Sequence, residues 1–163
     1  MDYRISKLRN YLMGVIETLK KSKYPINADM LSNKVDNYSI DKIPTDTTVQ
    51  KWIIGTEVRR DVYSFRSRMN YSQDTINNLK NIGFFEDFEM LIDSNNKKGI
   101  LPDIQNIESI ECLNCGTLNN ADTNTAEFDI QIQIKYRDYE EREVSLWKRL
   151  LLVKILQVIL VIM

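Results

Sequence analysis

The feature that most constrains the fold of this chain is a strict alternation of apolar and polar residues from Ala126 to Tyr136. An alternation of period two gives a single strand one apolar and one polar face. Ile104 to Leu118 forms a second strand-like run, and the sequence NNADTNT between the two has turn composition. We therefore predict a long β-hairpin that packs one face on a core. The apolar positions are Phe128, Ile130, Ile132, Ile134 and Tyr136.

Composition limits the classes of protein to which the chain can belong. Its 163 residues suit one domain with a sizeable core. The chain has 22 basic and 23 acidic residues, so its net charge is close to zero and does not favour binding to nucleic acid or to an anionic membrane. Histidine, the usual general base and commonest metal ligand, is absent, which disfavours an enzyme without excluding one. The charged opening MDYRISKLRN lacks a signal-peptide apolar region, so we expect a cytoplasmic protein.

The two cysteines, Cys112 and Cys115, form a CxxC motif in ECLNCG. Such a pair can be half of a zinc site, but only carboxylates or a second chain could supply the other ligands here. A redox pair is typical of a helix N-terminus, whereas this pair lies within or at the end of a predicted strand. We predict two structural thiols in a reducing compartment, and no metal or cofactor site.

Three helices are predicted. The first begins with Asp2 as a cap and ends near Ser22 to Tyr24, because Pro25 disfavours helical geometry in the residue before it. A short second helix covers Ser72 to Lys80, with Ser72 and Asp74 at its N-terminus, and Gly83 ends it. The apolar stripe of the first helix consists of Ile5, Leu8, Leu12, Val15, Ile16 and Leu19.

The third predicted helix runs from Phe84 to about Asn95, with Gly99 as its C-terminal cap. Its apolar side is typical of helix-on-sheet packing, although an aromatic cluster of this kind can also line a ligand pocket. That side consists of Phe84, Phe85, Phe88, Leu91 and Ile92, with Met90 at its edge.

The remaining strands are predicted between the first two helices. They cover Ile26 to Leu31, Asn37 to Ile43, and Val49 to Met69 with a break or bulge at Gly55. The order of helix, strands, helix pair and hairpin predicts an α+β domain. Its antiparallel or mixed sheet would carry the N-terminal helix and the helix pair.

A row of arginines is the candidate interface. Arg60, Arg66 and Arg68 share one face of a predicted strand, with Arg59 adjacent. These side chains could contact an acidic partner or nucleic-acid phosphates. The alternative is a solvated sheet face neutralised by carboxylates elsewhere, and the lack of interleaved aromatic residues gives single-strand binding little support.

Several segments together resemble a family of small proteins from phages of Gram-positive hosts, often labelled minor capsid proteins, which act as tail terminators. The segments are NYSIDKIPTD, RRDVYSFRSRMNYSQDTINNLKNIGFFEDFEMLI, NKKGILP and IESIECLNCGTLNNADTNTAEFDIQIQIKY. The resemblance covers about residues 1–138, and the order and spacing of these segments carry it. None is a catalytic fingerprint, and motifs of nucleotide-binding, zinc-protease or serine-hydrolase sites do not occur.

The resemblance implies a structural, non-enzymatic role without a cofactor. Family members are expected to form a hexameric ring that caps the tail tube, stops tail growth and meets the head–tail connector. In contractile tails and tail-like bacteriocins, the ring also contacts the sheath. The implied location is a virion tail or tail-like particle assembled in the host cytoplasm, with no membrane partner and no specific nucleic-acid sequence. Alternatives are another connector or stopper protein, or a small ligand-binding α+β domain.

Residues 139–163 depart from the family pattern. From Leu150 to Met163 only Lys154 and Gln157 are polar, yet the stretch is too short for an ordinary transmembrane helix. It could pack on the core or on a neighbouring subunit, or anchor at a membrane surface. A third interpretation is an incidental tail caused by a reading-frame change, which the abrupt end of the alternation favours.

Overall fold

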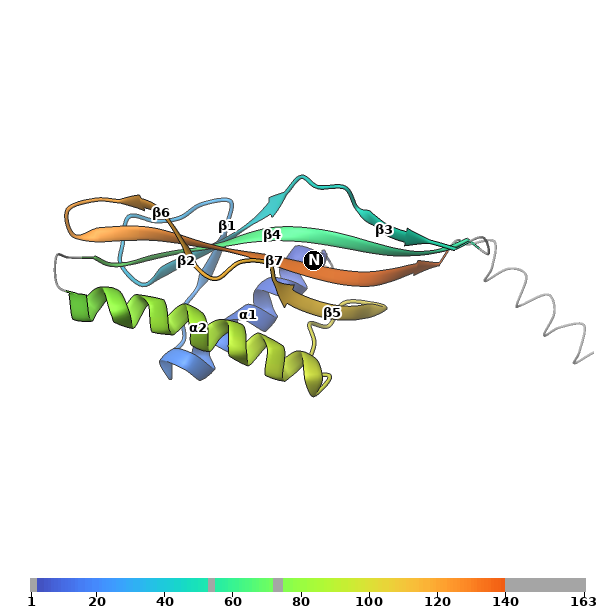
Figure 1. Ribbon diagram of the computed structural model, residues 1–163, viewed down its shortest axis with the longest axis horizontal. Coiled ribbons are helices and arrows are strands. Elements are labelled where there is room, and N and C mark those ends of the chain that lie inside the picture. Colours follow the sequence, from blue (N-terminus) through green and yellow to red (C-terminus); the bar gives the residue numbers. More distant parts are fainter. Residues whose placement is uncertain (1–2, 53–54, 72–74, 140–163) are drawn as a thin grey trace, which may run out of the picture.

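The computed structural model describes residues 3–52, 55–71 and 75–139. Within them the chain forms two helices and a seven-stranded sheet, with both helices on one face of the sheet (Figure 1). The α+β prediction is therefore confirmed. In chain order the elements are α1 (Arg4–Lys20), β1 (Ile26–Ala28), β2 (Asn37–Ile43), β3 (Thr48–Lys51), β4 (Thr56–Asn70), α2 (Thr75–Lys97), β5 (Ile107–Cys112), β6 (Thr117–Ala121) and β7 (Thr125–Tyr139).

The centre of the sheet is an antiparallel ladder between β4 and β7. Each strand has 15 residues, and the pairing runs from Thr56 with Tyr139 to Asn70 with Thr125. Strands β2 and β3 follow one another along the outer edge of β4, and β5 and β6 do the same along β7. Only β1, which pairs in parallel with β2, makes the described sheet mixed.

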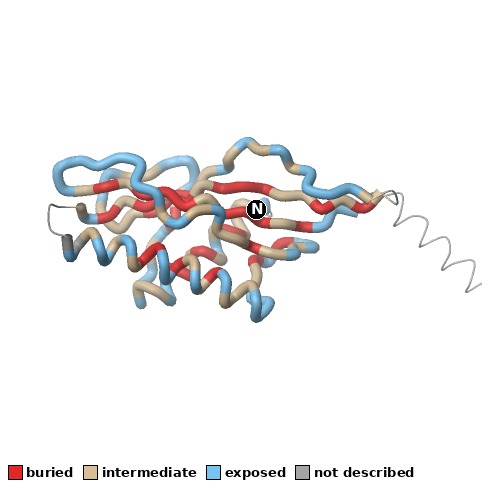
Figure 2. Tube along the Cα trace, viewed as in Figure 1, coloured by how far each residue is buried: buried red, intermediate tan, exposed pale blue. Residues whose placement is uncertain are grey.

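The alternation in β7 divides the two faces of the sheet as predicted. All five of its apolar residues are buried, and Ile130, Ile132 and Ile134 are completely inaccessible. The buried positions of β4, β7 and the helices form one continuous core (Figure 2). The sheet face away from the helices carries mainly polar and charged side chains, although the buried Val58 and Val62 also lie on it.

Helix α1 covers the sheet with the predicted apolar stripe. Leu8, Leu12, Val15 and Ile16 are buried, with Ile5 and Leu19 packed at the margin. The helix ends at Lys20, earlier than predicted, because Lys21 adopts a left-handed conformation with φ of 53°. Asp2, the predicted cap, lies outside the described residues.

The predicted helix pair is wrong, because a single helix, α2, spans both segments. Gly83 lies in its interior, and an interior glycine costs only about 1 kcal/mol relative to alanine. Four buried side chains on the inner face hold the helix on the sheet despite this cost. They are Phe84, Phe85, Phe88 and Ile92. Met90, predicted at the edge of this face, is exposed, and residues 72–74 lie outside the described ranges.

The C-terminal end of α2 confirms the predicted glycine cap. Gly99 has φ of 71°, which is readily accessible to glycine. The Ile100 amide donates to the Asn95 carbonyl at 2.8 Å, and the Gly99 amide donates to the Asn96 carbonyl at 3.1 Å. This pair of hydrogen bonds is a Schellman motif, which satisfies two of the last carbonyls of the helix.

Two of the predicted strands are divided in the structure. The break at Gly55 is confirmed, since its φ of 95° separates β3 from β4. The run from Ile104 to Leu118 was predicted as one strand, which is wrong, because a loop after Cys112 separates β5 from β6. In that loop the side-chain oxygen of Asn114 accepts a hydrogen bond from the backbone N–H of Gln131 on β7 at 2.6 Å. In a continuous strand, a backbone carbonyl would accept this bond instead. Strand β1 also ends earlier than predicted, at Ala28.

Gly116 in the same loop lies directly against the core. A Cβ atom at this position would lie 2.4 Å from the ring of Phe85, which is almost completely buried. Only a residue without a side chain permits this approach. The loop between β5 and β6 is therefore fixed by tertiary packing as well as by its hydrogen bonds.

Candidate functional site

The candidate arginines lie on the central ladder but do not form one group. Arg60, Arg66 and Arg68 share the face of β4 that points away from the helices, as predicted. Arg59 lies on the opposite face, because adjacent residues of a strand point to opposite sides. There its guanidinium donates to Asp138 at 3.0 Å and to the Thr47 hydroxyl at 3.2 Å.

Arg66 and Arg68 belong to an ion-pair network that crosses three strands. Arg66 on β4 donates to Asp41 on β2 at 2.6 Å and approaches Glu127 on β7 at 3.5 Å. Arg68 pairs with the other oxygen of Glu127 at 3.3 Å and with Asp122 at 3.6 Å. The network fixes the relative register of β2, β4 and β7.

The other groups on this face also have partners within the protein. Arg60 donates to the Asp46 carbonyl at 3.0 Å, and the Ser64 hydroxyl donates to Asp129. On the neighbouring part of the face, Lys135 donates to Glu111 at 3.0 Å. Carboxylates neutralise Arg66 and Arg68, whereas Arg60 binds a backbone carbonyl. The geometry therefore favours a sheet face neutralised by carboxylates over a phosphate-binding surface.

A second charged cluster, which the sequence analysis did not identify, lies on the helix-covered face. Asp61 is only 1% exposed and accepts hydrogen bonds from Arg4 of α1 and Lys42 of β2, each at 2.8 Å. The Arg4 guanidinium also lies 4.5 Å from the centroid of the Tyr136 ring. A signal was present in the sequence, because Asp61 is a charged residue on the face shared by Tyr63 and Phe65.

Burial and the neighbouring charges set the protonation states of Asp61 and Tyr63 in this cluster. Burial alone would raise the pKa of Asp61, but the hydrogen bonds from Lys42 and Arg4 outweigh burial and lower that pKa. Burial raises the pKa of the Tyr63 hydroxyl, and the charge of Asp61 adds to that effect. At neutral pH Asp61 is therefore an ionised, paired carboxylate and Tyr63 is a neutral phenol, an arrangement that suits structure better than proton transfer.

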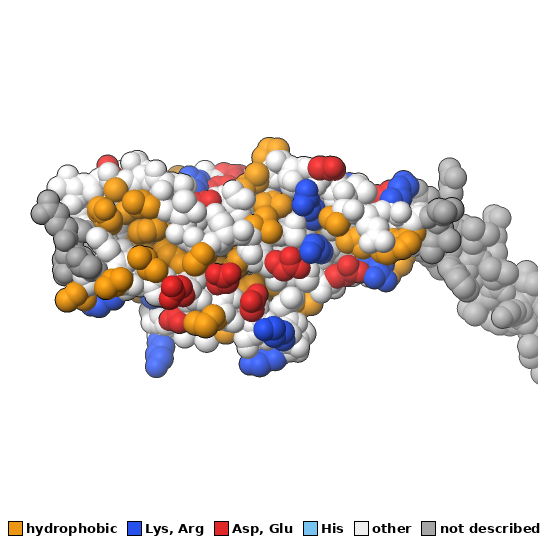
Figure 3. Space-filling view, viewed as in Figure 1, with side chains coloured by type: hydrophobic (Ala, Val, Ile, Leu, Met, Phe, Trp, Pro, Cys, Tyr) orange, Lys and Arg blue, Asp and Glu red, His pale blue; other side chains and the backbone are white. Residues whose placement is uncertain are grey.

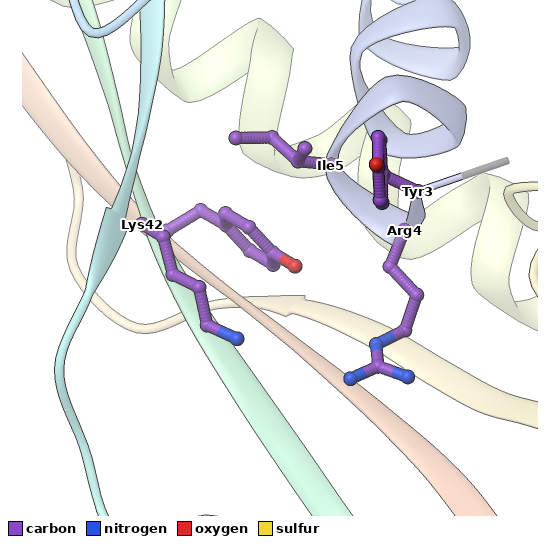
Figure 4. A pocket seen from close by; sticks show the side chains of 5 residues that line it. Tyr3, Arg4, Ile5 and Lys42 are labelled. Atoms are coloured by element: carbon purple, nitrogen blue, oxygen red, sulfur yellow. The ribbon is translucent and has the colours of Figure 1, made fainter. Parts of the chain in front are cut away.

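A cleft of about 360 Å³ opens beside this cluster (Figure 4). Tyr3, Arg4 and Ile5 line it from the start of α1, and Lys42 and Tyr63 line it from the sheet. Its two cations both bind Asp61, which occupies them but neutralises only one of their two positive charges.

The CxxC motif lies where the sequence predicts, at the end of strand β5. Both thiols are free, Cys112 partly buried and Cys115 exposed. Burial raises the pKa of Cys112 to about 12, and the charges of Glu89 and Asp93 add to the effect. Burial also raises the pKa of Cys115, together with a hydrogen bond to Glu89. Reactive cysteines have lowered pKa values, so the geometry favours structural thiols.

Neither a metal centre nor a membrane span occurs in the described residues. No group of three or more Cys, Asp or Glu side chains within them is placed to hold a metal ion. Among the described helices, none has the length and apolar character required to cross a bilayer. In comparisons with known proteins, no family model and no curated protein matches this chain.

Proposed function

We propose that this protein is a structural subunit of a phage tail or tail-like particle, a tail terminator. Six copies form a ring that caps the tail tube, stops its elongation and presents a surface to the head–tail connector. The partners are further copies of this chain, the tube protein and the connector, with the sheath added in contractile tails. The chain acts through its surfaces, without catalysis or a cofactor.

The observation that carries this proposal is the placement of two exposed edge strands. Every residue of β3 and β6 is exposed. Strand β3 pairs with β4 at residues 57–59, whereas β6 pairs with β7 at residues 126–129, so the two edges lie on opposite sides and at opposite ends of the ladder (Figure 1). An exposed edge accepts a further strand. Different edges at opposite ends suit a head-to-tail contact, the type that closes into rings.

The sequence and the charged clusters support the same role. The order of the segments from NYSIDKIPTD to the final hairpin resembles tail terminators. The arginine network and Asp61 stabilise the sheet, and their charges are largely neutralised within the chain. A second candidate from the same class is a connector or stopper, which would occupy a different layer of the particle. The small ligand-binding domain is a weaker candidate, since the cleft beside Asp61 has its cations already paired.

The decisive experiment is cryo-electron microscopy of the tail from the source particle. A six-fold ring of this chain on the last layer of the tube is the expected result. Density for the chain on the head side of that layer would identify a connector instead. A particle without the chain would overturn the assembly role.

Variants of the edge strands test the ring contact. Val49 on β3 and Leu118 on β6 are exposed aliphatic residues, and Val49→Glu or Leu118→Glu should prevent ring formation on tube tips without unfolding the subunit. Ile100→Glu is the matched control, because Ile100 is equally exposed but lies in the loop after α2. Rings formed normally by both edge variants would contradict the edge-strand contact.

A further inference from the structure

The cleft beside Asp61 carries a positive charge that no described residue neutralises. Arg4 and Lys42 each bind Asp61 at 2.8 Å, so two cations share a single carboxylate. Their side chains nevertheless remain 46% and 52% exposed. Because Asp61 is itself almost completely buried, it holds both cations in place from below without covering them. The cleft therefore presents one uncompensated positive charge at its opening.

The two cations also have hydrogen-bond donors to spare. Only the Nε of Arg4 donates to Asp61, and within the described part of the chain the two terminal nitrogens of its guanidinium have no acceptor. The Lys42 ammonium can likewise donate more hydrogen bonds than the one that Asp61 accepts. Figure 4 shows the charged ends of both side chains facing the space between them. A guanidinium fork beside an ammonium, both held by a buried carboxylate, is an arrangement that binds a further carboxylate.

Unpaired carboxylates of the required kind lie on the outward face of α2. With 3.6 residues per turn, Glu86 and Asp93 lie on the side of the helix away from the buried Phe88. Both are exposed, and no described residue forms an ion pair with either of them. Glu89, which lies between them, accepts a hydrogen bond from the Cys115 thiol. Figure 3 shows acidic side chains along this part of the molecule, next to hydrophobic ones.

The cleft and the acidic face of α2 lie toward opposite edges of the sheet. Lys42 belongs to β2, which follows one side of β4, and in the described sheet β1 covers β2 only at residues 38–40. Helix α2 packs on β5, at the other edge. Strands β3 and β6 follow these same two sides of the ladder (Figure 1). The basic cleft and the acidic face therefore accompany the two edges of the proposed head-to-tail contact.

We propose that the cleft of one copy binds the acidic side chains of α2, Glu86 and Asp93, in the next copy of the ring. This inference rests on the proposed ring and names a contact within it. Two different surfaces meet, so the contact is head to tail, as ring closure requires. Complementary charges of this kind fix the register of neighbouring subunits and disfavour wrong partners.

A second copy fits the cleft better than a free anion does, because apolar groups adjoin the charged ones on both surfaces. Tyr3 at the cleft is 64% exposed. Ile82 and Met90, which flank the acidic residues of α2, are 50% and 61% exposed. Contact between copies would remove this apolar area from water, whereas a free anion would gain only the charge.

Carbodiimide cross-linking tests the contact directly, because it joins a carboxylate to an amine only where the two groups touch. Isotopically labelled and unlabelled copies of the full chain are mixed, added to tail tubes assembled without this chain, cross-linked and digested for mass spectrometry. The expected result is a peptide pair that joins Lys42 of one isotopic form to Glu86 or Asp93 of the other. Capped tubes without this pair, or with the pair only within a single copy, would overturn the contact and leave the ring standing. Tubes that stay uncapped would overturn the ring, and the contact with it.

A matched pair of variants on α2 provides a second measurement. Glu86→Lys places a cation against the cleft, so capping half of the tubes should require at least about tenfold more protein. Asp87→Lys is the control, because Asp87 is also exposed and makes the same change of charge at the adjacent position, about 100° around the helix. Both positions are exposed, so circular dichroism should show that both variants fold. Equal capping by the two variants would contradict the proposal.

Discussion

Lys42→Met should expose how strongly the buried carboxylate of Asp61 depends on its partners. Asp61 is completely enclosed, and its two oxygens are each bound at 2.8 Å, one by Lys42 and the other by Arg4. Methionine retains much of the apolar stem of lysine but removes its charge. One oxygen of an ionised, buried carboxylate then loses its partner.

The expected cost follows from the exposure of the two cations. Removing one partner from a fully buried ion pair destabilises a protein by about 3–5 kcal/mol. Here the Lys42 side chain is 52% exposed and Arg4 remains in place, so solvent screening reduces the expected loss to about 1–2 kcal/mol. Lys51→Met is the matched control, because Lys51 binds the more exposed Glu57 at 2.6 Å and such surface pairs contribute roughly 0–1 kcal/mol.

The pH dependence of the free energy of unfolding gives a second test that the ionised carboxylate of Asp61 causes this loss of stability. The pKa of Asp61 is lower in the folded protein than in the unfolded chain, where an aspartate titrates near about 3.9. The stability from its ion pairs is therefore fully present above that pH and is lost as pH falls through the folded pKa. The cost of Lys42→Met should be largest near neutral pH and should shrink in acid.

Urea unfolding followed by circular dichroism at pH 7 and at a pH below the unfolded pKa measures both effects. The double-variant cycle with Asp61→Asn isolates the pair from other effects of each change. The reasoning is refuted if Lys42→Met costs no more than Lys51→Met, or if its cost is the same at both pH values.

Three further predictions concern other parts of the fold. Gly116→Ala should lower the free energy of unfolding by about 1–3 kcal/mol, because its Cβ would meet the buried ring of Phe85. Gly83→Ala has open space around it and should raise the free energy of unfolding by about 0.5–1 kcal/mol, measured in the same urea titration. Cys115 should react with iodoacetamide at pH 8 faster than Cys112, whose pKa of about 12 keeps it protonated; equal rates in a mass-spectrometric time course would contradict the burial difference. Arg66→Glu should destabilise the isolated subunit, because it places a fourth carboxylate beside Asp41, Glu127 and Asp122; an unchanged thermal midpoint would show that the network contributes little.

Patterns set by local geometry were predictable from the sequence. The side chains of β7 alternate between faces because the backbone of a strand does, and five apolar residues in a row of alternate positions could face only a core. The stripe of α1, the break at Gly55 and the cap at Gly99 have the same origin, since each depends on the conformation of a few consecutive residues. The shared face of Arg60, Arg66 and Arg68 also follows from alternation.

The continuity of α2 and the separation of β5 from β6 were decided by the tertiary structure, because both depend on contacts between residues far apart in the sequence. Gly83 signals a helix end locally, yet packing of Phe84 and Phe88 on the sheet outweighs its small cost and keeps α2 continuous. The division of β5 from β6 depends on Asn114 reaching β7, which no periodicity records.

The same distinction between local geometry and tertiary packing applies to the arginine network and to the Asp61 cluster. The sequence placed three arginines on one face, but only the strand order brought Asp41 and Glu127 to Arg66 and neutralised it. Similarly, Asp61 is separated from Arg4 by 57 positions, and only the docking of α1 on the sheet joins them. The sequence by itself determined which side chains share a face, because that depends on backbone geometry within one element. The tertiary structure decided which charges meet, because that depends on how the elements pack.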